Sequence, residues 1–347
     1  MTDIKNFDGE TIHVTNQIYD KLSNKFIFKT PFNNLNLYVE DFDINNTKYD
    51  NIIGLSNNNI YNEPTIVINT LHACWSHAYI DFMFSFFWTY SNLKEKYNIN
   101  EVNFFIRKGK MLMYKHNQDA VINNKYKKNF QTLIELIPHN NLLFEHLLHR
   151  DTRLIFKNCY HYILDDKFQR SPYNCRNYYF NRDTQIENVK YSDKTISEYL
   201  TKFSEHIFKK YNLNQKENSN KQKNIVILNK KSHPDNTMAI ITIPNLEYIV
   251  DIINNNKNYT YNGIKYFEDL YFKTQLEIII DNDIIISVHG GALLHMIHGK
   301  NKLYIEYFND SRTNSMYQRV SSLTNNRLLQ LPVNSDKRNI CNILNRL

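Results

Sequence analysis

The residues best placed to do chemistry stand at positions 289–291, where His289 is followed by two glycines. A β-branched apolar run at 283–288 predicts a buried strand, and an apolar segment at 291–297 predicts a helix. Residues 303–307 predict a second strand, which completes a βαβ unit. Glycines let the backbone approach a phosphate closely, and the N–H groups of a helix N-terminus favour an anion. The same residues also fit an ordinary tight βα turn that binds nothing.

Two further groups could complete a nucleotide site. Glu306 ends the second strand of this unit, where its carboxylate could accept hydrogen bonds from ribose hydroxyls. Lys230 and Lys231 follow a predicted strand at 224–229. Their charges would then lie at the carboxyl end of that strand, where cations could meet a diphosphate. The alternative is a solvated lysine pair, because lysine is abundant throughout the chain.

A second candidate group lies in the apolar segment 74–87, which predicts a buried helix that starts near Ser76. His77 and Asp81 are four residues apart, so they share one face of that helix. A histidine and a carboxylate are costly to bury on an apolar helix, which makes them candidates for acid–base chemistry. The alternative is a structural pair, in which a core histidine hydrogen-bonds the carboxylate.

The remaining pattern divides the chain into two α/β domains. An amphipathic helix at 192–211 is followed by a polar, charged segment at 212–223, which is the clearest linker in the chain. We therefore predict an N-terminal domain of residues 1–200 and a C-terminal domain of residues 201–347. The last residues predict a helix that packs back on the first domain.

Shorter segments give weaker signals. Strands are predicted at 26–28, 37–39, 65–68 and 102–106. Helices are predicted at 130–137, 142–148, 246–253 and 272–280. The aromatic stretch 151–190 predicts an irregular loop packed over the core, with the lining of an acceptor cleft as the alternative.

The composition excludes several classes of protein. The chain has 347 residues and a formal net charge of +7, without the basic run that marks a nucleic-acid-binding arm. It shows no signal peptide and no apolar run long enough to span a bilayer, which predicts a soluble, cytoplasmic protein with no integral membrane segment. The abundant Asn, Ile, Lys and Tyr have AT-rich codons, and a virus would be one such source. The cysteines are too few for a disulfide scaffold and form no C-x-x-C pair: Cys74, Cys159, Cys175 and Cys341.

In their order along the chain, these pieces resemble glycosyltransferase family 61. That family shows a His-aromatic-x-x-Asp element, a strand ending in Arg-Arg, a helix entry with Glu or Ser and Gln, a His-Gly-Ala-Gly-Leu motif and a strand ending in Glu. The counterparts here are His77–Asp81, Lys230-Lys231, Leu270–Gln275, His289–Met296 and Ile305–Tyr307. Two departures stand out. The loop has Gly291-Ala292 where the family has Ala-Gly, and lysines replace the arginines, which removes bidentate phosphate recognition but keeps the charge.

The resemblance implies a GT-B fold, in which two Rossmann-like domains face a central cleft. It implies inverting transfer of a hexosyl or pentosyl group from a UDP-sugar, bound by the C-terminal domain, to a hydroxyl of a glycan or protein acceptor. No metal or other cofactor is expected, and the two Asp-x-Asp triplets, 41–43 and 281–283, match a metal motif in letters only.

The resemblance also assigns roles to particular residues. Inversion needs one general base, for which Asp81 is preferred and His77 is the other candidate. Glu306 would hold the ribose. The diphosphate would be held by Lys230, Lys231, His289, Gly290, Gly291 and Ala292. Two alternatives remain open: a catalytically inactive nucleotide- or sugar-binding protein of the same fold, and a nucleic-acid-binding protein, which the lack of a basic patch disfavours.

Overall fold

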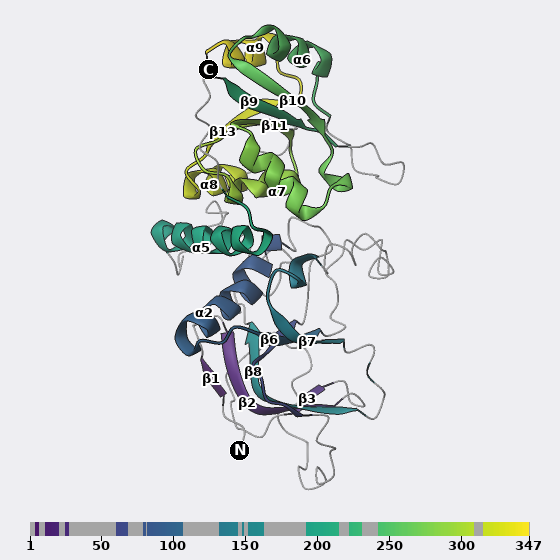
Figure 1. Ribbon diagram of the computed structural model, residues 1–347, viewed down its shortest axis with the longest axis vertical. Coiled ribbons are helices and arrows are strands. Elements are labelled where there is room, and N and C mark those ends of the chain that lie inside the picture. The colour runs from purple at the N-terminus through teal and green to yellow at the C-terminus, as the bar shows by residue number, and fades with distance from the viewer. Residues whose placement is uncertain are drawn as a thin grey trace. The chain divides into compact units, whose positions relative to one another are not determined.

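The chain forms two compact units, residues 1–175 and 176–347, here called the N-terminal unit and the C-terminal unit (Figure 1). Each has its own β-sheet with helices, so the predicted α/β class is confirmed. The boundary predicted at residue 200 falls inside a helix of the C-terminal unit. The computed structural model describes residues 4–6, 11–20, 25–27, 60–68, 79–80, 82–106, 132–144, 148, 152–162, 192–214, 222–230, 242–308 and 315–346.

The described strands of the N-terminal unit form one mixed sheet. Its order is β1-β2-β8-β5-β6-β7, with β3 beside β2 and β4 beside β8. Strand β2 pairs antiparallel with β1, β3 and β8, whereas β4 and β5 pair parallel with β8. The strands are β1 (Ile4–Asn6), β2 (Thr11–Asp20), β3 (Lys25–Ile27), β4 (Ile60–Tyr61), β5 (Thr65–Ile68), β6 (Val102–Ile106), β7 (His139–Phe144) and β8 (Arg153–Tyr162).

Two predictions for this unit are wrong. The segment 142–148 was expected to be helical, but residues 139–144 form β7, which runs parallel to β6. A short apolar run cannot distinguish a helix from a strand by its period, and here the pairing with β6 decides. The stretch 151–190 was expected to be irregular, but residues 153–162 form β8, which lies between β2 and β5 in the sheet.

The apolar segment that carries the predicted His77–Asp81 pair is helical where it is described. A π-helical turn, η3 (Phe82–Phe87), leads directly into helix α2 (Trp88–Tyr97). The phenylalanines of this turn are buried, as the apolar run predicts. His77 and Asp81 lie outside the described residues, so their pairing stays a prediction.

The C-terminal unit contains a parallel sheet in the order β10-β9-β11-β12-β13. Strand β11 is buried along its whole length, and its Ile-Ile-Ile-Ser-Val run is typical of a strand covered on both faces. The strands predicted at 224–229, 283–288 and 303–307 are confirmed as β9, β11 and β12, while β10 and β13 were not predicted. The bounds are β9 (Lys223–Leu228), β10 (Tyr259–Lys265), β11 (Ile284–Val288), β12 (Leu303–Phe308) and β13 (Arg327–Pro332).

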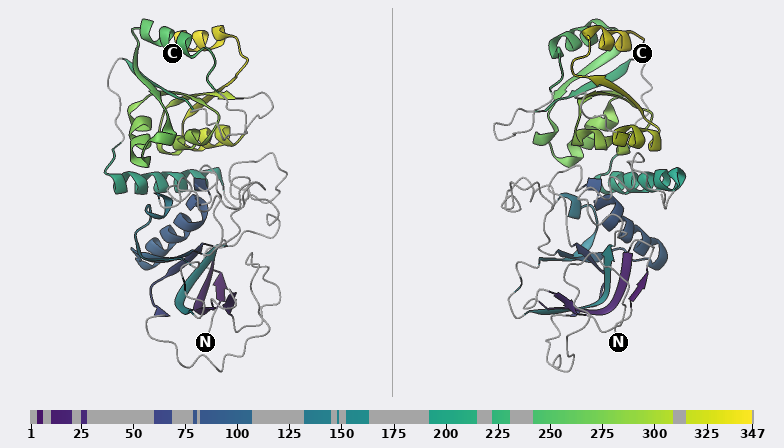
Figure 2. Two further views of the ribbon diagram at one scale, coloured as in Figure 1. Left: turned by 90° about the vertical axis from the view of Figure 1, so that its right-hand side faces the viewer. Right: turned by 180° about the vertical axis from the view of Figure 1, so that it is seen from behind.

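Helices cover both faces of this sheet. Helices α6 (Leu246–Asn255) and α9 (Lys337–Arg346) lie on one face, and α7 (Phe272–Asp281) and α8 (Ser315–Leu323) lie on the other (Figure 2). The 3₁₀ helix η8 (Gly291–His298) packs against α7 and α8, and the short η7 (Phe267–Asp269) precedes α7. Ile340 and Leu344 of α9 belong to the core of this unit, where the prediction had α9 pack back on the first domain.

Helix α5 (Asp193–Tyr211) is the amphipathic helix that the sequence predicts, and it packs on η8 and α8. Its N-terminus is capped by Ser192, whose Oγ accepts a hydrogen bond from the Thr195 N–H at 3.1 Å. Asn212 ends the helix with a left-handed backbone conformation, φ 53° and ψ 49°. Ser197 Oγ donates to the Leu323 carbonyl at 2.6 Å, which ties α5 to the end of α8.

Lys302, a buried lysine just before β12, caps the C-terminal end of helix α7. Lys302 Nζ donates to the carbonyls of Ile280 and Asn282 at 2.9 and 2.6 Å, and so satisfies the last turn of α7. Burial lowers the pKa of Lys302, while Asp283 and Asp281 act in the opposite direction. Lysine therefore serves here as a C-terminal helix cap.

Replacing this cap is expected to destabilise the C-terminal unit. Lys302→Met keeps the apolar stem but leaves two buried carbonyls without their donor, which costs about 1–3 kcal/mol. Urea denaturation followed by far-UV circular dichroism would measure the change. Lys300→Met, at an exposed position nearby, is the control and is expected to have little effect. Equal stabilities of the two variants would contradict the capping role.

Candidate functional site

The candidate site lies where the order of the parallel sheet reverses. Strands β9 and β11 are neighbours, but the chain leaves β9 toward β10 on one side and reaches β12 from β11 on the other. Ligands of open α/β sheets bind at such switch points, outside the carboxyl ends of the strands. At this edge β9 leads into Asn229 and Lys230, and β11 leads into His289 and Gly290. The sequence-predicted residues Lys230, His289 and Gly290 are therefore brought together.

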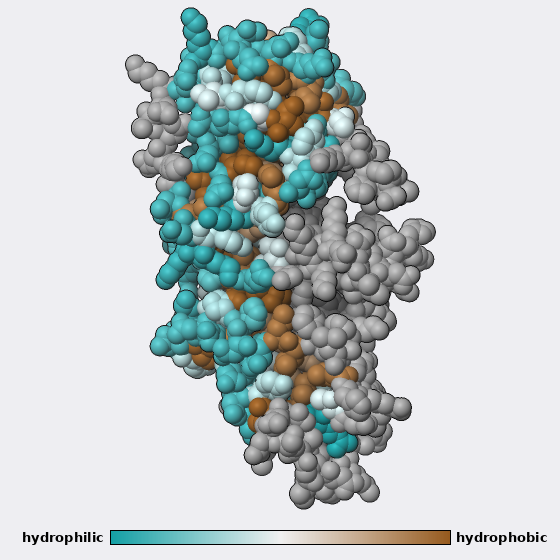
Figure 3. All heavy atoms as spheres, turned by 45° about the vertical axis from the view of Figure 1, so that its right-hand side comes forward, coloured by the Kyte–Doolittle hydropathy of each residue, from teal (hydrophilic) through white to brown (hydrophobic). Residues whose placement is uncertain are grey.

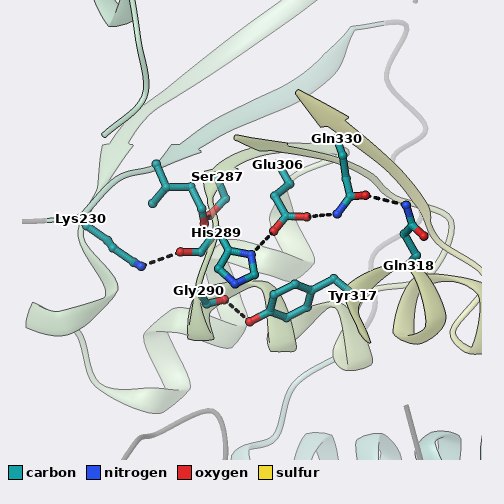
Figure 4. Close-up of polar contacts among 9 residues, drawn as sticks. Lys230, Ser287, His289, Gly290, Glu306, Tyr317, Gln318 and Gln330 are labelled. Carbon is teal, nitrogen blue, oxygen red and sulfur yellow. Dashed lines mark hydrogen bonds and ion pairs between the residues drawn. The ribbon is translucent and has the colours of Figure 1, made fainter. Parts of the chain in front are cut away.

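Lys230 crosses from the end of β9 to the end of β11. Its Nζ donates to the carbonyl oxygen of His289 at 2.5 Å (Figure 4). Its backbone N–H donates to Asn229 Oδ1 at 3.0 Å, which holds the turn that follows β9. The lysine places a positive charge against the glycine turn. Lys231 lies outside the described residues.

Gly290 makes room for that lysine. A Cβ atom at this position would lie 2.5 Å from Lys230 Nζ and 2.7 Å from Lys230 Cε. The backbone at Gly290 has φ 155° and ψ −172°, a region that is essentially reserved for glycine. Tyr317 Oη donates to the Gly290 carbonyl at 2.7 Å, so α8 fixes the turn from the other side.

His289 is paired with the buried carboxylate of Glu306. The distance from His289 Nδ1 to Glu306 Oε1 is 2.6 Å, and the Glu306 side chain is 0% exposed, against 20% for His289. An ionised carboxylate only accepts hydrogen bonds, so Nδ1 carries a proton. Among the described residues Nε2 has no hydrogen-bond partner. The Tyr317 ring packs edge-on against the imidazole at 5.3 Å.

Two glutamines continue this contact away from the site. Gln330 Nε2 donates to Glu306 Oε2 at 2.7 Å, and Gln318 Nε2 donates to Gln330 Oε1 at 2.5 Å. Figure 4 shows Glu306 between His289 and Gln330, with Gln318 at the far end. Sequence reasoning missed both glutamines and Tyr317. Gln330 is the register partner of Glu306 on β13, a relation that only the strand pairing reveals.

The turn after β11 starts a 3₁₀ helix where an α-helix was expected. Gly291 and Ala292 form its first turn, and Leu293 N–H donates to the Gly290 carbonyl at 3.0 Å. The first N–H groups of any helix lack partners within that helix. The amides of Gly291 and Ala292 therefore remain the candidates for an anion contact that the sequence predicts.

Metal-ligand clusters and membrane-spanning helices were both sought among the described residues. No cluster of three or more His, Cys, Asp or Glu side chains within them is arranged to bind a metal ion. Asp283, from one Asp-x-Asp triplet, accepts the Asn224 N–H at 2.8 Å at the amino end of β9, away from the candidate site. No described helix is long and apolar enough to cross a bilayer. On the face drawn in Figure 3, hydrophilic residues surround several hydrophobic patches of the described surface.

No protein-family model matches this chain, and no curated protein matches it significantly.

Gln275, which lies in the segment matched to the helix entry of glycosyltransferase family 61, has a structural role here. Gln275 Nε2 donates to the carbonyls of Phe267 and Leu270 at 2.8 and 3.1 Å, and its Oε1 lies 2.8 Å from Nε2 of the buried His295. His298 Nδ1 lies 3.1 Å from Ser204 Oγ on α5. Burial lowers the pKa of His295 to about 3, and burial followed by the neighbouring His295 lowers the pKa of His298. Both rings are therefore neutral parts of the core.

Proposed function

We propose that this protein is an inverting glycosyltransferase of the GT-B type, which transfers a sugar from a UDP-sugar to a hydroxyl of a glycan or protein acceptor. One observation carries the proposal: Lys230, His289 and Gly290 converge at the switch point of a parallel sheet, with a helix N-terminus beside them. This combination of a cation, an imidazole and a close-approach glycine suits a diphosphate. The UDP-sugar donor, the inverting transfer and the GT-B type are proposed from the order of motifs along the chain, which resembles that of glycosyltransferase family 61.

In the proposed reaction the acceptor oxygen forms a bond to the anomeric carbon while the bond from that carbon to the diphosphate oxygen breaks. The electron pair leaves with UDP, so negative charge grows on the diphosphate. Lys230, His289 and the amides of Gly291 and Ala292 would stabilise that charge, with Lys231 adding a second cation. The acceptor proton passes to a general base, which we assign to Asp81, with His77 as the second candidate.

UDP is expected to bind the wild-type chain and to raise its melting temperature, because a ligand of the native state stabilises it. Lys230→Met should weaken UDP by about tenfold or more, since one charge-assisted contact is lost. Lys257→Met, at an exposed position near the amino end of β10, should bind UDP like the wild type. Calorimetric titration in the presence and absence of EDTA tests this together with the proposed independence of metal.

The outcomes separate the alternatives. Release of UDP from a UDP-sugar, with transfer to an acceptor, supports the enzyme, whereas UDP binding without any turnover favours an inactive nucleotide-binding protein. Failure to bind any uridine nucleotide would remove the proposal, and so would equal UDP affinity of the Lys230→Met and wild-type chains. Loss of UDP binding on adding EDTA would refute metal independence.

A further inference from the structure

We propose that Glu306 acts through His289: it is a positioning residue, which, together with Gln330 and Gln318, orients the imidazole toward the diphosphate. The inference rests on the proposed function for the identity of the ligand, but not for the geometry. It changes the role expected for Glu306, which the sequence placed on the ribose.

Burial keeps Glu306 out of reach of a ribose in this arrangement. Its side chain is fully buried, Oε1 accepts from His289 Nδ1 and Oε2 accepts from Gln330 Nε2. A ribose hydroxyl could reach either oxygen only if the residues that bury Glu306 moved apart. The imidazole, which is 20% exposed, is the member of the pair that a ligand can reach.

The polarity of the hydrogen-bond chain follows from the carboxylate. Because the carboxylate can only accept, Gln330 must present Nε2 to it and therefore turns Oε1 outward. Gln330 Oε1 then accepts from Gln318 Nε2, which fixes the orientation of the Gln318 amide. In the other direction the carboxylate fixes the proton of His289 on Nδ1. Nε2 is then the ring nitrogen left to meet a phosphate oxygen. To donate to that oxygen Nε2 must carry a proton as well, so the ring that meets the diphosphate is the imidazolium, with Glu306 on one side and the ligand on the other.

The four side chains of this hydrogen-bond series come from, or directly follow, three strands and one helix, and these elements restrain them. His289 follows β11, Glu306 lies on β12, Gln330 on β13 and Gln318 on α8. Tyr317, beside Gln318 on α8, bonds the carbonyl of Gly290. Helix α8 therefore holds both the imidazole and the glycine turn, and the orientation of His289 Nε2 is set before any ligand arrives.

Binding of three probes to Glu306→Gln distinguishes the two roles. UDP and inorganic pyrophosphate should bind about tenfold more weakly than to the wild type, while uridine, which has ribose but no phosphate, should bind unchanged. Titration calorimetry serves for the tight ligands and ligand-detected NMR for uridine. Glu277→Gln, a partly exposed carboxylate paired with Lys273 on α7, is the matched control and should alter none of the three. Equal weakening of uridine and UDP would restore the ribose contact and overturn the inference.

Exchanging the side chains of residues 306 and 330 should restore the hydrogen bonds that Glu306→Gln breaks. In Glu306→Gln the new amide faces the amide of Gln330, so two donors meet. In the double variant Glu306→Gln/Gln330→Glu, the glutamine can accept from His289 and donate to the new carboxylate, which again accepts from Gln318. The double variant should recover most of the pyrophosphate affinity. A double variant no better than Glu306→Gln would overturn the positioning role.

A measurement on the wild-type chain keeps the inference testable if a variant does not fold or no nucleotide binds. The ¹⁵N chemical shifts of the His289 ring should show Nδ1 protonated in the free protein. A ring protonated on Nε2 alone would overturn the inference, because Nδ1 could not then donate to Glu306. A wild-type chain that binds pyrophosphate but no uridine nucleotide would refute the proposed function and leave this result standing.

Discussion

Acidification from pH 7 to pH 5 is expected to destabilise the C-terminal unit by about 4 kcal/mol through His295 and His298 alone. Both imidazoles are fully buried among aromatic rings. His295 lies 5.3 Å from the Phe267 ring and 5.5 Å from that of Phe272, and 6.2 Å separates the two histidine rings. A charge on either ring would lack water and would face a second imidazole.

The sign follows from the lowered pKa of each histidine. In the unfolded chain the pKa of histidine is about 6.5, whereas burial lowers that of His295 to about 3 and that of His298 also well below its usual value. Well above pH 6.5 both states are neutral and stability does not depend on these groups. Below it the unfolded chain takes up protons that the folded chain refuses, so unfolding gains about 1.4 kcal/mol per pH unit for each ring.

Urea denaturation between pH 7 and pH 5, followed by far-UV circular dichroism, measures this slope. Trp75 and Trp88 are the two tryptophans and both belong to the N-terminal unit, so their fluorescence reports that unit separately. The double variant His295→Gln/His298→Asn should be less stable at pH 7 but should lose most of the slope. His206→Gln on α5 shows the effect of removing a histidine outside the cluster. An unchanged slope in the double variant would rule out these two groups as its cause.

Gly290→Ala is expected to weaken pyrophosphate and UDP by about 10–100-fold. The new Cβ would lie 2.5 Å from Lys230 Nζ, so the lysine must leave the His289 carbonyl. The backbone, at φ 155° and ψ −172°, adds strain of about 1–3 kcal/mol. The substitution therefore moves the cation and distorts the turn together, and titration calorimetry on the folded variant would measure the loss.

Gly299→Ala is the matched steric control. Its Cβ would lie 2.6 Å from Tyr304 Oη and 3.0 Å from Lys302 Cδ, a similar crowding at the amino end of β12. It should lower stability without changing ligand affinity. In a double variant with Lys230→Ala, Gly290→Ala should weaken binding less than it does alone, because the lysine that it displaces is gone. Wild-type affinity in Gly290→Ala would show that this turn is not the phosphate site.

The core of the C-terminal unit could be predicted because its signals are local. The apolar run of β11, the glycines after it and the amphipathic pattern of α5 each identify an element without knowledge of its partners. Strand β10 was missed because Asn262 and Gly263 interrupt it, and β13 because it is an edge strand that ends in Pro332. In the N-terminal unit β7 and β8 were missed because pairing, not period, makes them strands.

Some residues of the candidate site could likewise be predicted from local sequence, whereas others depend on the tertiary structure. Lys230, His289 and Gly290 could be predicted because each lies within two residues of the end of a strand. Gln330, the second partner of Glu306, could not be predicted, because its place depends on the register of β12 with β13. The places of Tyr317 and Gln318 depend on how α8 packs. A side chain that a pattern places at a strand end can point to a ligand or to a neighbouring strand, and only the tertiary structure decides.

The place of β9 in its sheet has a consequence for how the chain folds during synthesis. Strand β9 is made first among the strands of the C-terminal unit, yet it lies between β10 and β11. Ile225 pairs with Ile284, so one edge of β9 has no partner until α6, β10 and α7 have left the ribosome. Such non-local pairing slows folding, and an apolar strand with an open edge is a surface on which nascent chains associate. The arrangement that forms the candidate ligand-binding edge thus also leaves the apolar run Ile225–Leu228 with an unpaired edge until β11 has been synthesised.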